Sequence, residues 1–287
     1  MHTAARRAAP CSRCRAVPLD RTPDPADYPH DTDVTELDLI IDLHLRNPRQ
    51  GPGSATETRR AVELARLDPN TPLAIADLGC GTGASTLILA RTLNAHVTAI
   101  DAAAPFIDRL RARAREHGLD DRITAKTGDI ASLPFRDEAF DVLWSEAAIY
   151  NLGFARGIRV WRRLLRPGGI LVVSELTWTT AYRPAAAKAH WSREYPGISM
   201  PSSNLRTLEE AGYRPRGMFL LPPECWSEEY YDPLEASFES FLDRHDGSAA
   251  ARQIVAAEQA EIELHREHGR SYGYTFYLAE KVADDGR

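Results

Sequence analysis

The sequence has 287 residues, of which 43% are hydrophobic and 26% are charged, and its formal net charge is −6. A chain of this length can bury a sizeable core, so its stability requires neither disulfides nor a metal. Non-specific binding to nucleic acids depends on a basic surface, and the acidic balance therefore argues against a dedicated DNA or RNA binder. Every apolar run is shorter than the roughly 18–20 residues of a membrane helix, so we expect no membrane span.

Residues 1–30 are rich in Arg, Pro, Ala and Asp and have almost no apolar periodicity. Such a composition predicts a disordered tail. Arg6 and Arg7 are not followed by an apolar segment, which argues against a secretory signal and favours a cytoplasmic location. Cys11 and Cys14 have the spacing of half a zinc site, but no second pair follows, and we expect free thiols and no metal site.

Residues 31–70 predict an N-terminal helical cap. Asp33-x-x-Glu36 resembles a capping box and opens an apolar stripe, and Ser54-x-x-Glu57 forms a second one after a glycine-rich turn. We therefore expect two short helices, the first ended by Pro48 and followed by a turn at Gly51-Pro-Gly53.

From residue 71 onwards short apolar strands alternate with amphipathic helices, the pattern of a parallel α/β sheet. We expect strands over 73–77, 96–101, 122–126, 140–145, 170–175, 215–221 and 273–280. Helices are expected over 84–93, 104–117, 153–165, 202–211 and, with little interruption, 233–268, with a turn at Pro167-Gly168-Gly169 and a glycine C-cap at Gly118.

The strongest local signal is a loop of three alternating glycines, Asp77-Leu-Gly79-Cys-Gly81-Thr-Gly83, directly after the first strand. Glycines allow a tight turn and let a ligand approach the backbone. With Asp101 at the end of the next strand, this loop satisfies a relaxed NAD fingerprint. The Asp77 carboxylate would disfavour a pyrophosphate and suit a cationic ligand, and Asp129 ends the third strand where it could accept a hydrogen bond from an adenine amino group. Both cofactor types remain open at this point.

Five motifs in order then resemble class I S-adenosylmethionine-dependent methyltransferases. They are the glycine loop, Asp101, Gly128-Asp129, Phe140-Asp141-Val142 and Leu165-Arg-Pro-Gly-Gly169. The resemblance covers roughly residues 71–282. It implies a Rossmann-like, mostly parallel seven-stranded sheet with an antiparallel last strand, and S-adenosyl-L-methionine as cofactor.

The resemblance also implies a role for individual residues. Gly79 and Gly81 would pass under the methionine and ribose parts of the cofactor, Asp101 would hold the ribose hydroxyls, Asp129 and Ile130 would frame the adenine, and Ser145 would lie near the reactive end. Three further segments (Arg49–Ser54, Ser145–Gly153 and Tyr272–Tyr277) are similar to bacterial small-molecule methyltransferases related to the ubiquinone and menaquinone biosynthesis type. This narrower likeness makes Gln50 a possible contact to the methionine end.

Glu146 and Tyr150 follow the fourth strand, beyond the carboxyl end of the sheet where ligands bind in such folds. Glu146 is a candidate to deprotonate or orient an incoming hydroxyl or amine, and Tyr150 a candidate to position it. The alternative is that Glu146 caps a turn and Tyr150 packs. The run after this strand differs from that of nucleic-acid amino-methylating enzymes, which disfavours a DNA or RNA substrate.

The segments at about 178–200 and 226–272 interrupt the sheet pattern and carry most of the aromatic residues. We expect a helical lid that selects the substrate, in which most of these aromatics serve as packing. The sequence thus predicts an enzyme that methylates an oxygen, nitrogen or carbon of a small organic molecule. One alternative is an NAD-dependent oxidoreductase, although the sequence lacks a plausible catalytic Tyr-x-x-x-Lys pair. The other alternative is a non-catalytic relative that binds a cofactor.

Overall fold

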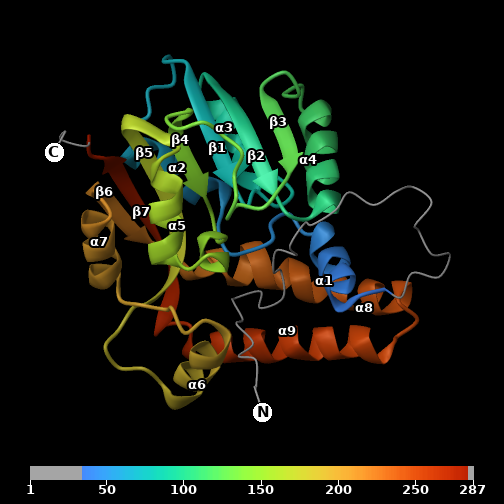
Figure 1. Cartoon of the computed structure of the whole chain (residues 1–287). Helices are drawn as coiled ribbons and strands as arrows, with labels where there is room; N and C mark the ends of the chain where they lie inside the picture. Colours follow the sequence, from blue (N-terminus) through green and yellow to red (C-terminus); the bar gives the residue numbers. More distant parts are fainter. Residues whose placement is uncertain (1–33, 284–287) are drawn as a thin grey trace, which may run out of the picture.

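The computed structural model describes residues 34–283. The predicted tail over 1–30, with Cys11 and Cys14, lies outside these residues. Within them the chain forms one seven-stranded sheet flanked by helices (Figure 1).

The sheet has the strand order β3-β2-β1-β4-β5-β7-β6. Its strands are β1 Leu73–Leu78, β2 Ala95–Asp101, β3 Ile123–Thr127, β4 Phe140–Ser145, β5 Leu165–Trp178, β6 Tyr213–Leu220 and β7 Tyr272–Lys281. The first five strands pair in parallel, and β7 is antiparallel to both β5 and β6. The sequence-based prediction of a mostly parallel sheet with an antiparallel last strand is confirmed.

Helices cover both faces of this sheet. The helices are α1 Glu36–Leu45, α2 Ala55–Leu64, α3 Ala84–Thr92, α4 Ala104–Glu116, α5 Phe154–Arg162, α6 Ala185–Glu194, α7 Pro201–Glu210, α8 Asp232–Arg244 and α9 Ala249–His268. Buried side chains of α2, α3 and α4 pack in one hydrophobic cluster, and those of α5 and α7 pack in a second cluster on the opposite face. Strands buried on both faces are nearly continuous in hydrophobic residues, which is why β4 reads Phe-Asp-Val-Leu-Trp-Ser.

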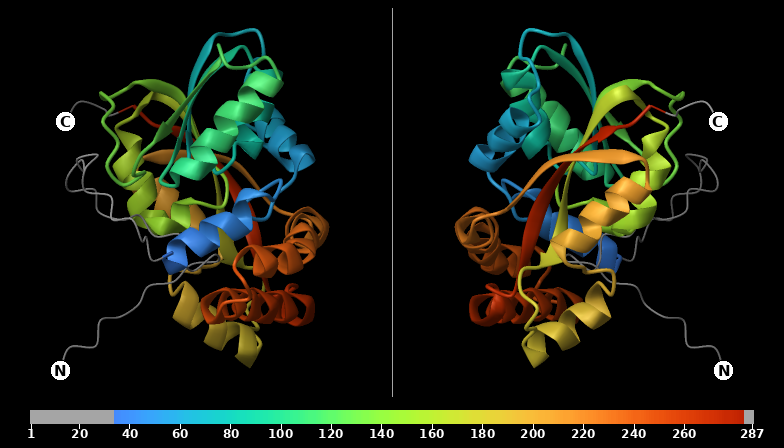
Figure 2. Two further views of the ribbon diagram at one scale, coloured as in Figure 1. Left: turned by 90° about the vertical axis from the view of Figure 1, so that its right-hand side faces the viewer. Right: turned by 90° about the vertical axis from the view of Figure 1, so that its left-hand side faces the viewer.

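The carboxyl ends of the parallel strands point towards a separate group of helices. Figures 1 and 2 show α1, α6, α8 and α9 gathered beyond this end of the sheet. Helix α1 is tied to α8 because Arg244 and His245 both contact the Asp42 carboxylate, at 2.8 and 3.0 Å. The expected lid segments therefore face the edge of the sheet where ligands bind in this architecture.

Several element boundaries differ from the sequence-based expectation. The capping box of α1 is formed by Thr35 and Asp38, whereas the predicted Asp33 lies outside the described residues. Helix α7 begins after Met200 with Pro201 at its first position, not at the Ser-Ser-Asn run. The expected helix over 233–268 is two helices, because Asp246 and Gly247 adopt positive φ angles of 52° and 55°. Left-handed backbone of this kind ends one helix and lets the chain reverse.

Strand β5 is the largest departure, because it is much longer than the expected 170–175. The Pro167-Gly168-Gly169 turn is an irregularity at the start of the strand, and the strand continues to Trp178 through antiparallel pairing with β7. Residues 174–178 consequently extend beyond the end of β4, whose last residue Ser145 pairs with Val173.

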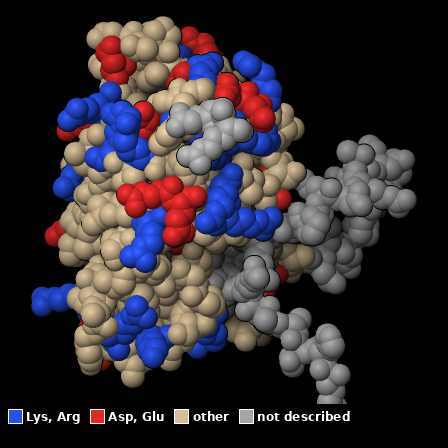
Figure 3. Space-filling view, turned by 60° about the vertical axis from the view of Figure 1, so that its left-hand side comes forward, with Lys and Arg blue, Asp and Glu red and all other residues tan. Residues whose placement is uncertain are grey.

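The described surface carries charges of both signs. On the face in Figure 3, Lys and Arg side chains lie among Asp and Glu side chains. Among residues 34–283 no helix is long and apolar enough to cross a membrane, and no group of three His, Cys, Asp or Glu side chains is arranged to hold a metal ion.

Candidate active site

The glycine loop connects β1 to α3 through left-handed backbone. Gly79, Gly81 and Gly83 have φ angles of 75°, 53° and 85°. A Cβ atom on Gly79 would collide with Ala148, and one on Gly81 would collide with the side-chain oxygen of Gln50. The loop thus needs glycine for its conformation and for close contact with two distant segments.

Gln50 ties the turn between α1 and α2 to this loop. Its Oε1 accepts a hydrogen bond of 2.8 Å from the backbone N–H of Thr82, and its Nε2 donates to the carbonyl oxygens of His44 and Asn47 at 3.1 and 3.2 Å. These contacts fix the turn against the glycine loop, and a direct contact of Gln50 with the methionine end of a cofactor remains a prediction.

Asp77 is the penultimate residue of β1, lies underneath the loop and is fully buried. Its Oδ2 accepts hydrogen bonds from the hydroxyls of Ser85 and Thr86, at 2.8 and 2.6 Å, while its Oδ1 has no hydrogen-bond partner among the described residues. Burial raises the pKa of this carboxyl to about 7. A buried carboxyl with one unused oxygen is suited to meet a donor or a cation at this position.

Asp101 and Asp129 follow the neighbouring strands β2 and β3. The Asp101 carboxylate accepts hydrogen bonds from the backbone N–H groups of Gly81 and Ala103, both at 2.9 Å, which fixes it beside the glycine loop. Asp129 accepts one from Ala131 at 2.7 Å. Each carboxylate oxygen has two lone pairs, so both groups retain acceptor capacity towards a ligand.

Ile130 and Ser145 are fixed by contacts to other strands and helices. The carbonyl of Ile130 accepts a hydrogen bond of 2.8 Å from the indole of Trp161, and the buried Ser145 hydroxyl donates to the carbonyl of Leu78 at 2.7 Å. Ser145 therefore joins the ends of β4 and β1, next to the glycine loop.

Glu146 is held by three donors. Its Oε1 accepts from the Thr58 hydroxyl at 2.8 Å and from the Trp144 indole at 2.9 Å, and its Oε2 accepts from the Arg49 guanidinium at 2.9 Å. The Arg49 and Glu146 side chains are only 9% and 7% exposed. Arg49 and Glu146 thereby fasten the turn between α1 and α2 to the segment after β4.

Tyr150 lies in the short 3-10 helix Ile149–Asn151 and is buried. Its ring meets that of Tyr195 edge to face, with centroids 6.2 Å apart. Tyr195 follows α6, so the contact joins the segment after β4 to one of the expected lid segments.

Sequence reasoning missed Glu175. This residue lies on the extended part of β5 and is 1% exposed, and neither of its carboxylate oxygens accepts a hydrogen bond of ordinary geometry from the described residues. Tyr195 faces it, and burial raises the pKa of Glu175 to about 8. The position could not be recognised from the sequence, because a strand ending at residue 175 leaves this side chain at a strand end with no defined partner.

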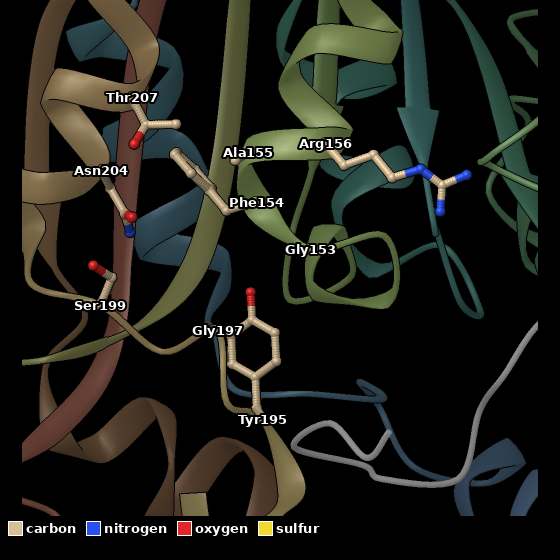
Figure 4. Close-up of a pocket in the computed structure, with 9 residues that line it drawn as sticks. All are labelled: Gly153, Phe154, Ala155, Arg156, Tyr195, Gly197, Ser199, Asn204 and Thr207. Atoms are coloured by element: carbon tan, nitrogen blue, oxygen red, sulfur yellow. The ribbon is translucent and has the colours of Figure 1, made fainter. Parts of the chain in front are cut away.

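A pocket of about 320 Å³ opens beside Tyr195. Figure 4 shows Tyr195 with its hydroxyl directed towards Gly153 and Phe154, and Ser199 and Asn204 on the neighbouring wall. The pocket lies between the start of α5, the start of α7 and the loop that joins α6 to α7.

Comparisons with known proteins agree with this geometry. Residues 75–169 match the protein family described as Methyltransferase domain. The chain is 26% identical over 276 residues to the 27-O-demethylrifamycin SV methyltransferase of Amycolatopsis mediterranei, covering 91% of this chain and 98% of that protein. It is 33% identical over 112 residues to the methyltransferase GfsG of Streptomyces halstedii, covering 39% of this chain and only 40% of that protein.

Among solved structures, an S-adenosylmethionine-dependent methyltransferase from Geobacter sulfurreducens in complex with S-adenosyl-L-homocysteine superposes with a TM-score of 0.74. The two chains are 22% identical, and the match covers 84% of this chain and 96% of the other. Residues 75–169 therefore match a methyltransferase domain, and the chain as a whole is similar in sequence and fold to S-adenosylmethionine-dependent methyltransferases, although it spans less than half the length of two of the relatives that it matches. S-adenosylmethionine is the cofactor of this family.

Proposed function

We propose that this chain transfers a methyl group from S-adenosylmethionine to an oxygen, nitrogen or carbon atom of a small organic molecule. The observation that carries the proposal is the placement of the glycine loop, Asp101 and Asp129 at one edge of the sheet. The segment after β4, which contains the buried Tyr150, adjoins this edge, and the acceptor would bind there.

The residues present fit the cofactor. Asp101 would accept hydrogen bonds from the ribose hydroxyls, and Asp129 with Ile130 would frame the adenine. Asp77 and Gln50 would lie towards the methionine part, where a nearby positive charge would favour the ionised form of the Asp77 carboxyl. The glycine loop leaves backbone free of Cβ atoms beneath the ligand.

The bound cofactor supplies a methyl group already activated on a sulfonium. The chain's own task is then to align the acceptor, and alignment alone contributes roughly 7–11 kcal/mol to lowering the barrier. We infer that α6, α8 and α9 form a lid that excludes water from the reacting atoms and selects the acceptor, since they cover the carboxyl ends of the strands (Figure 2).

Glu146 acts in this proposal as a positioning residue. Its three hydrogen-bond donors, of which Arg49 also forms an ion pair with it, restrain the segment that leads from Ser145 to Tyr150. Tyr150 would line the acceptor side of the site together with Tyr195. The proposed lid covers the acceptor side, which supports a small-molecule acceptor. A cytoplasmic location remains a prediction.

Calorimetry and thermal unfolding with S-adenosylmethionine, S-adenosylhomocysteine and NAD test the cofactor assignment. We expect both sulfur ligands to raise the Tm of the full chain, because a ligand that binds only the folded state stabilises it, and we expect NAD to have no effect. Release of S-adenosylhomocysteine in the presence of a panel of phenols, alcohols, amines and carboxylic acids tests the transfer. Stabilisation by NAD, or by none of the three ligands, would contradict the proposal.

A further inference from the structure

Glu175 lies beside the reacting end of the proposed site. Ser145, the last residue of β4, pairs with Val173, so Glu175 is two residues beyond the end of that strand. Its neighbour Ser174 accepts a hydrogen bond of 2.8 Å from the backbone N–H of Ala147. The side chain of Glu175 points to the other face of the strand, where it faces Tyr195, whose ring contacts Tyr150 in the segment after β4.

The environment of Glu175 provides one neutral neighbour, the Tyr195 hydroxyl, whose contact lowers the pKa of the carboxyl less than burial raises it. The side chain is 1% exposed, and both oxygens lack a hydrogen bond of ordinary geometry from the described residues. A buried polar group without a full set of hydrogen bonds destabilises the folded protein, and a charged one does so more strongly. A buried group that lowers the stability of the protein, and that a ligand donor would hydrogen-bond, is typical of a binding site.

The groups that face Glu175 are neutral phenols from three elements. They are Tyr195 after α6, Tyr277 on β7, and Tyr150 through its contact with Tyr195, whereas Tyr274 on β7 points to the opposite face of the sheet because Glu175 pairs with Thr275. Burial raises the pKa of Tyr195, Tyr274 and Tyr277 above the usual range, so these hydroxyls stay protonated. The ion pairs of the described residues do not include Glu175, so the site does not supply a cation of its own.

Tyr195 connects this carboxyl to the surface. Its side chain faces Glu175 and also lines the pocket of about 320 Å³ shown in Figure 4. The hydroxyl of Tyr195 contacts the Glu175 carboxyl and the backbone of Phe154, but neither contact has the geometry of an ordinary hydrogen bond. An acceptor that enters from this pocket would meet two groups with unused hydrogen-bonding capacity.

We propose that Glu175 and Tyr195 bind a hydroxyl group of the acceptor, and that the Glu175 carboxylate takes the proton of that hydroxyl as the methyl group is transferred. The inference rests on the proposed methyltransferase function and narrows it to O-methylation. An oxygen lone pair forms the new bond to the methyl carbon, the bond between that carbon and sulfur breaks, and its electron pair remains on sulfur. The products are a methyl ether or ester, S-adenosylhomocysteine and protonated Glu175, which then releases the proton to water.

This role gives a defined pH dependence. Burial raises the pKa of Glu175 to about 8, so the carboxylate that accepts the proton becomes more populated as the pH rises towards that value. With S-adenosylmethionine saturating, kcat for a hydroxyl acceptor should therefore rise with pH and level off above about 8.

The first test uses phenol as a probe of the chain saturated with S-adenosylhomocysteine. Infrared difference spectra at neutral pH report the carbonyl stretch of a protonated carboxyl, identified as Glu175 by its loss in Glu175→Gln. We expect phenol to shift this band in the wild type and in Glu228→Gln, a control at an exposed position. A band that phenol leaves unchanged overturns the inference.

The second test is kinetic and uses the hydroxyl acceptor of the panel with the highest turnover. We expect Glu175→Gln to lower kcat by about 10²–10⁴-fold, to abolish its rise with pH and to leave the Kd for S-adenosylhomocysteine unchanged. Glu175→Asp should restore part of the rise. A Glu175→Gln enzyme that keeps the wild-type pH profile overturns the inference, whereas failure to bind S-adenosylhomocysteine in the wild type overturns the proposed function instead.

Discussion

Asp101 is the residue whose surroundings define the cofactor edge most sharply. Its two oxygens accept from the N–H groups of Gly81 and Ala103, so the carboxylate is preorganised before any ligand binds. We expect Asp101→Ala to weaken the binding of both S-adenosylmethionine and S-adenosylhomocysteine about ten- to a hundredfold, because lost charge-assisted hydrogen bonds cost about 1.5–3 kcal/mol. Calorimetry measures the effect, with Asp108→Ala on the exposed side of α4 as the matched control. If the wild type and Asp101→Ala bind these two ligands with equal affinity, Asp101 does not bind the ribose hydroxyls.

Substitutions of Arg49 and Glu146 can distinguish a structural role of Glu146 from a catalytic one. Breaking a buried ion pair leaves an uncompensated charge and costs about 3–5 kcal/mol, whereas removing both charges costs less than the sum of the single changes. We expect Glu146→Gln to lower the free energy of unfolding and the double variant Arg49→Met/Glu146→Gln to show positive coupling in urea unfolding. A Glu146→Gln variant of wild-type stability whose kcat alone is strongly reduced would instead support Glu146 as a base.

At the scale of elements, the aromatic residues of the proposed lid form an internal core. Trp191 is fully buried, and its ring lies 5.1 Å from that of Tyr272, which in turn lies 6.0 Å from Trp226. We expect Trp191→Ala to lower the free energy of unfolding by about 3–5 kcal/mol, the usual cost of deleting a large buried ring. Thermal unfolding measures the loss, and the exposed Tyr182→Ala serves as the control because its side chain is 78% exposed. An unchanged Tm with a raised KM for the acceptor would assign Trp191 to substrate selection.

Whether a site residue could be predicted from the sequence depended on whether its environment is formed by nearby residues or by distant elements. The glycine loop, Asp101 and Asp129 could be predicted as cofactor candidates because each lies at or near the end of a strand whose signal is local, with a turn or helix start directly after it. The partner of Glu146 could not, because Arg49 is 97 residues away and their contact depends on how α1 and α2 pack. Glu175 was missed for the same reason, since only pairing with β7 extends β5 past residue 175 and buries that side chain.

At the scale of the whole molecule, two buried acids couple folding to pH. Burial raises the pKa of Asp77 to about 7 and that of Glu175 to about 8, from ordinary values of 3.8 and 4.5. Between the ordinary and the raised pKa, the folded chain binds a proton that the unfolded chain has already released. The contribution of each group to stability is therefore fully present below its ordinary pKa and is lost as the pH rises to the raised one.

For Glu175 this window runs from about 4.5 to about 8. Within it we expect the free energy of unfolding of the wild type, measured in urea without ligand, to fall relative to that of Glu175→Gln as the pH rises. One group changes the free energy of unfolding by at most about 1.4 kcal/mol per pH unit. Glu175→Gln lacks the contribution of Glu175 to this pH dependence, because the glutamine side chain does not titrate in either state. Comparing the two chains cancels the pH dependence of every other carboxyl and histidine, including the opposite contribution of Asp42, whose pKa is lowered by its contacts with His245 and Arg244. Parallel curves for the two chains across this range would mean that the folded protein holds Glu175 ionised at an ordinary pKa, in which case the side chain has a compensating partner and the cost that we assign to its burial does not exist.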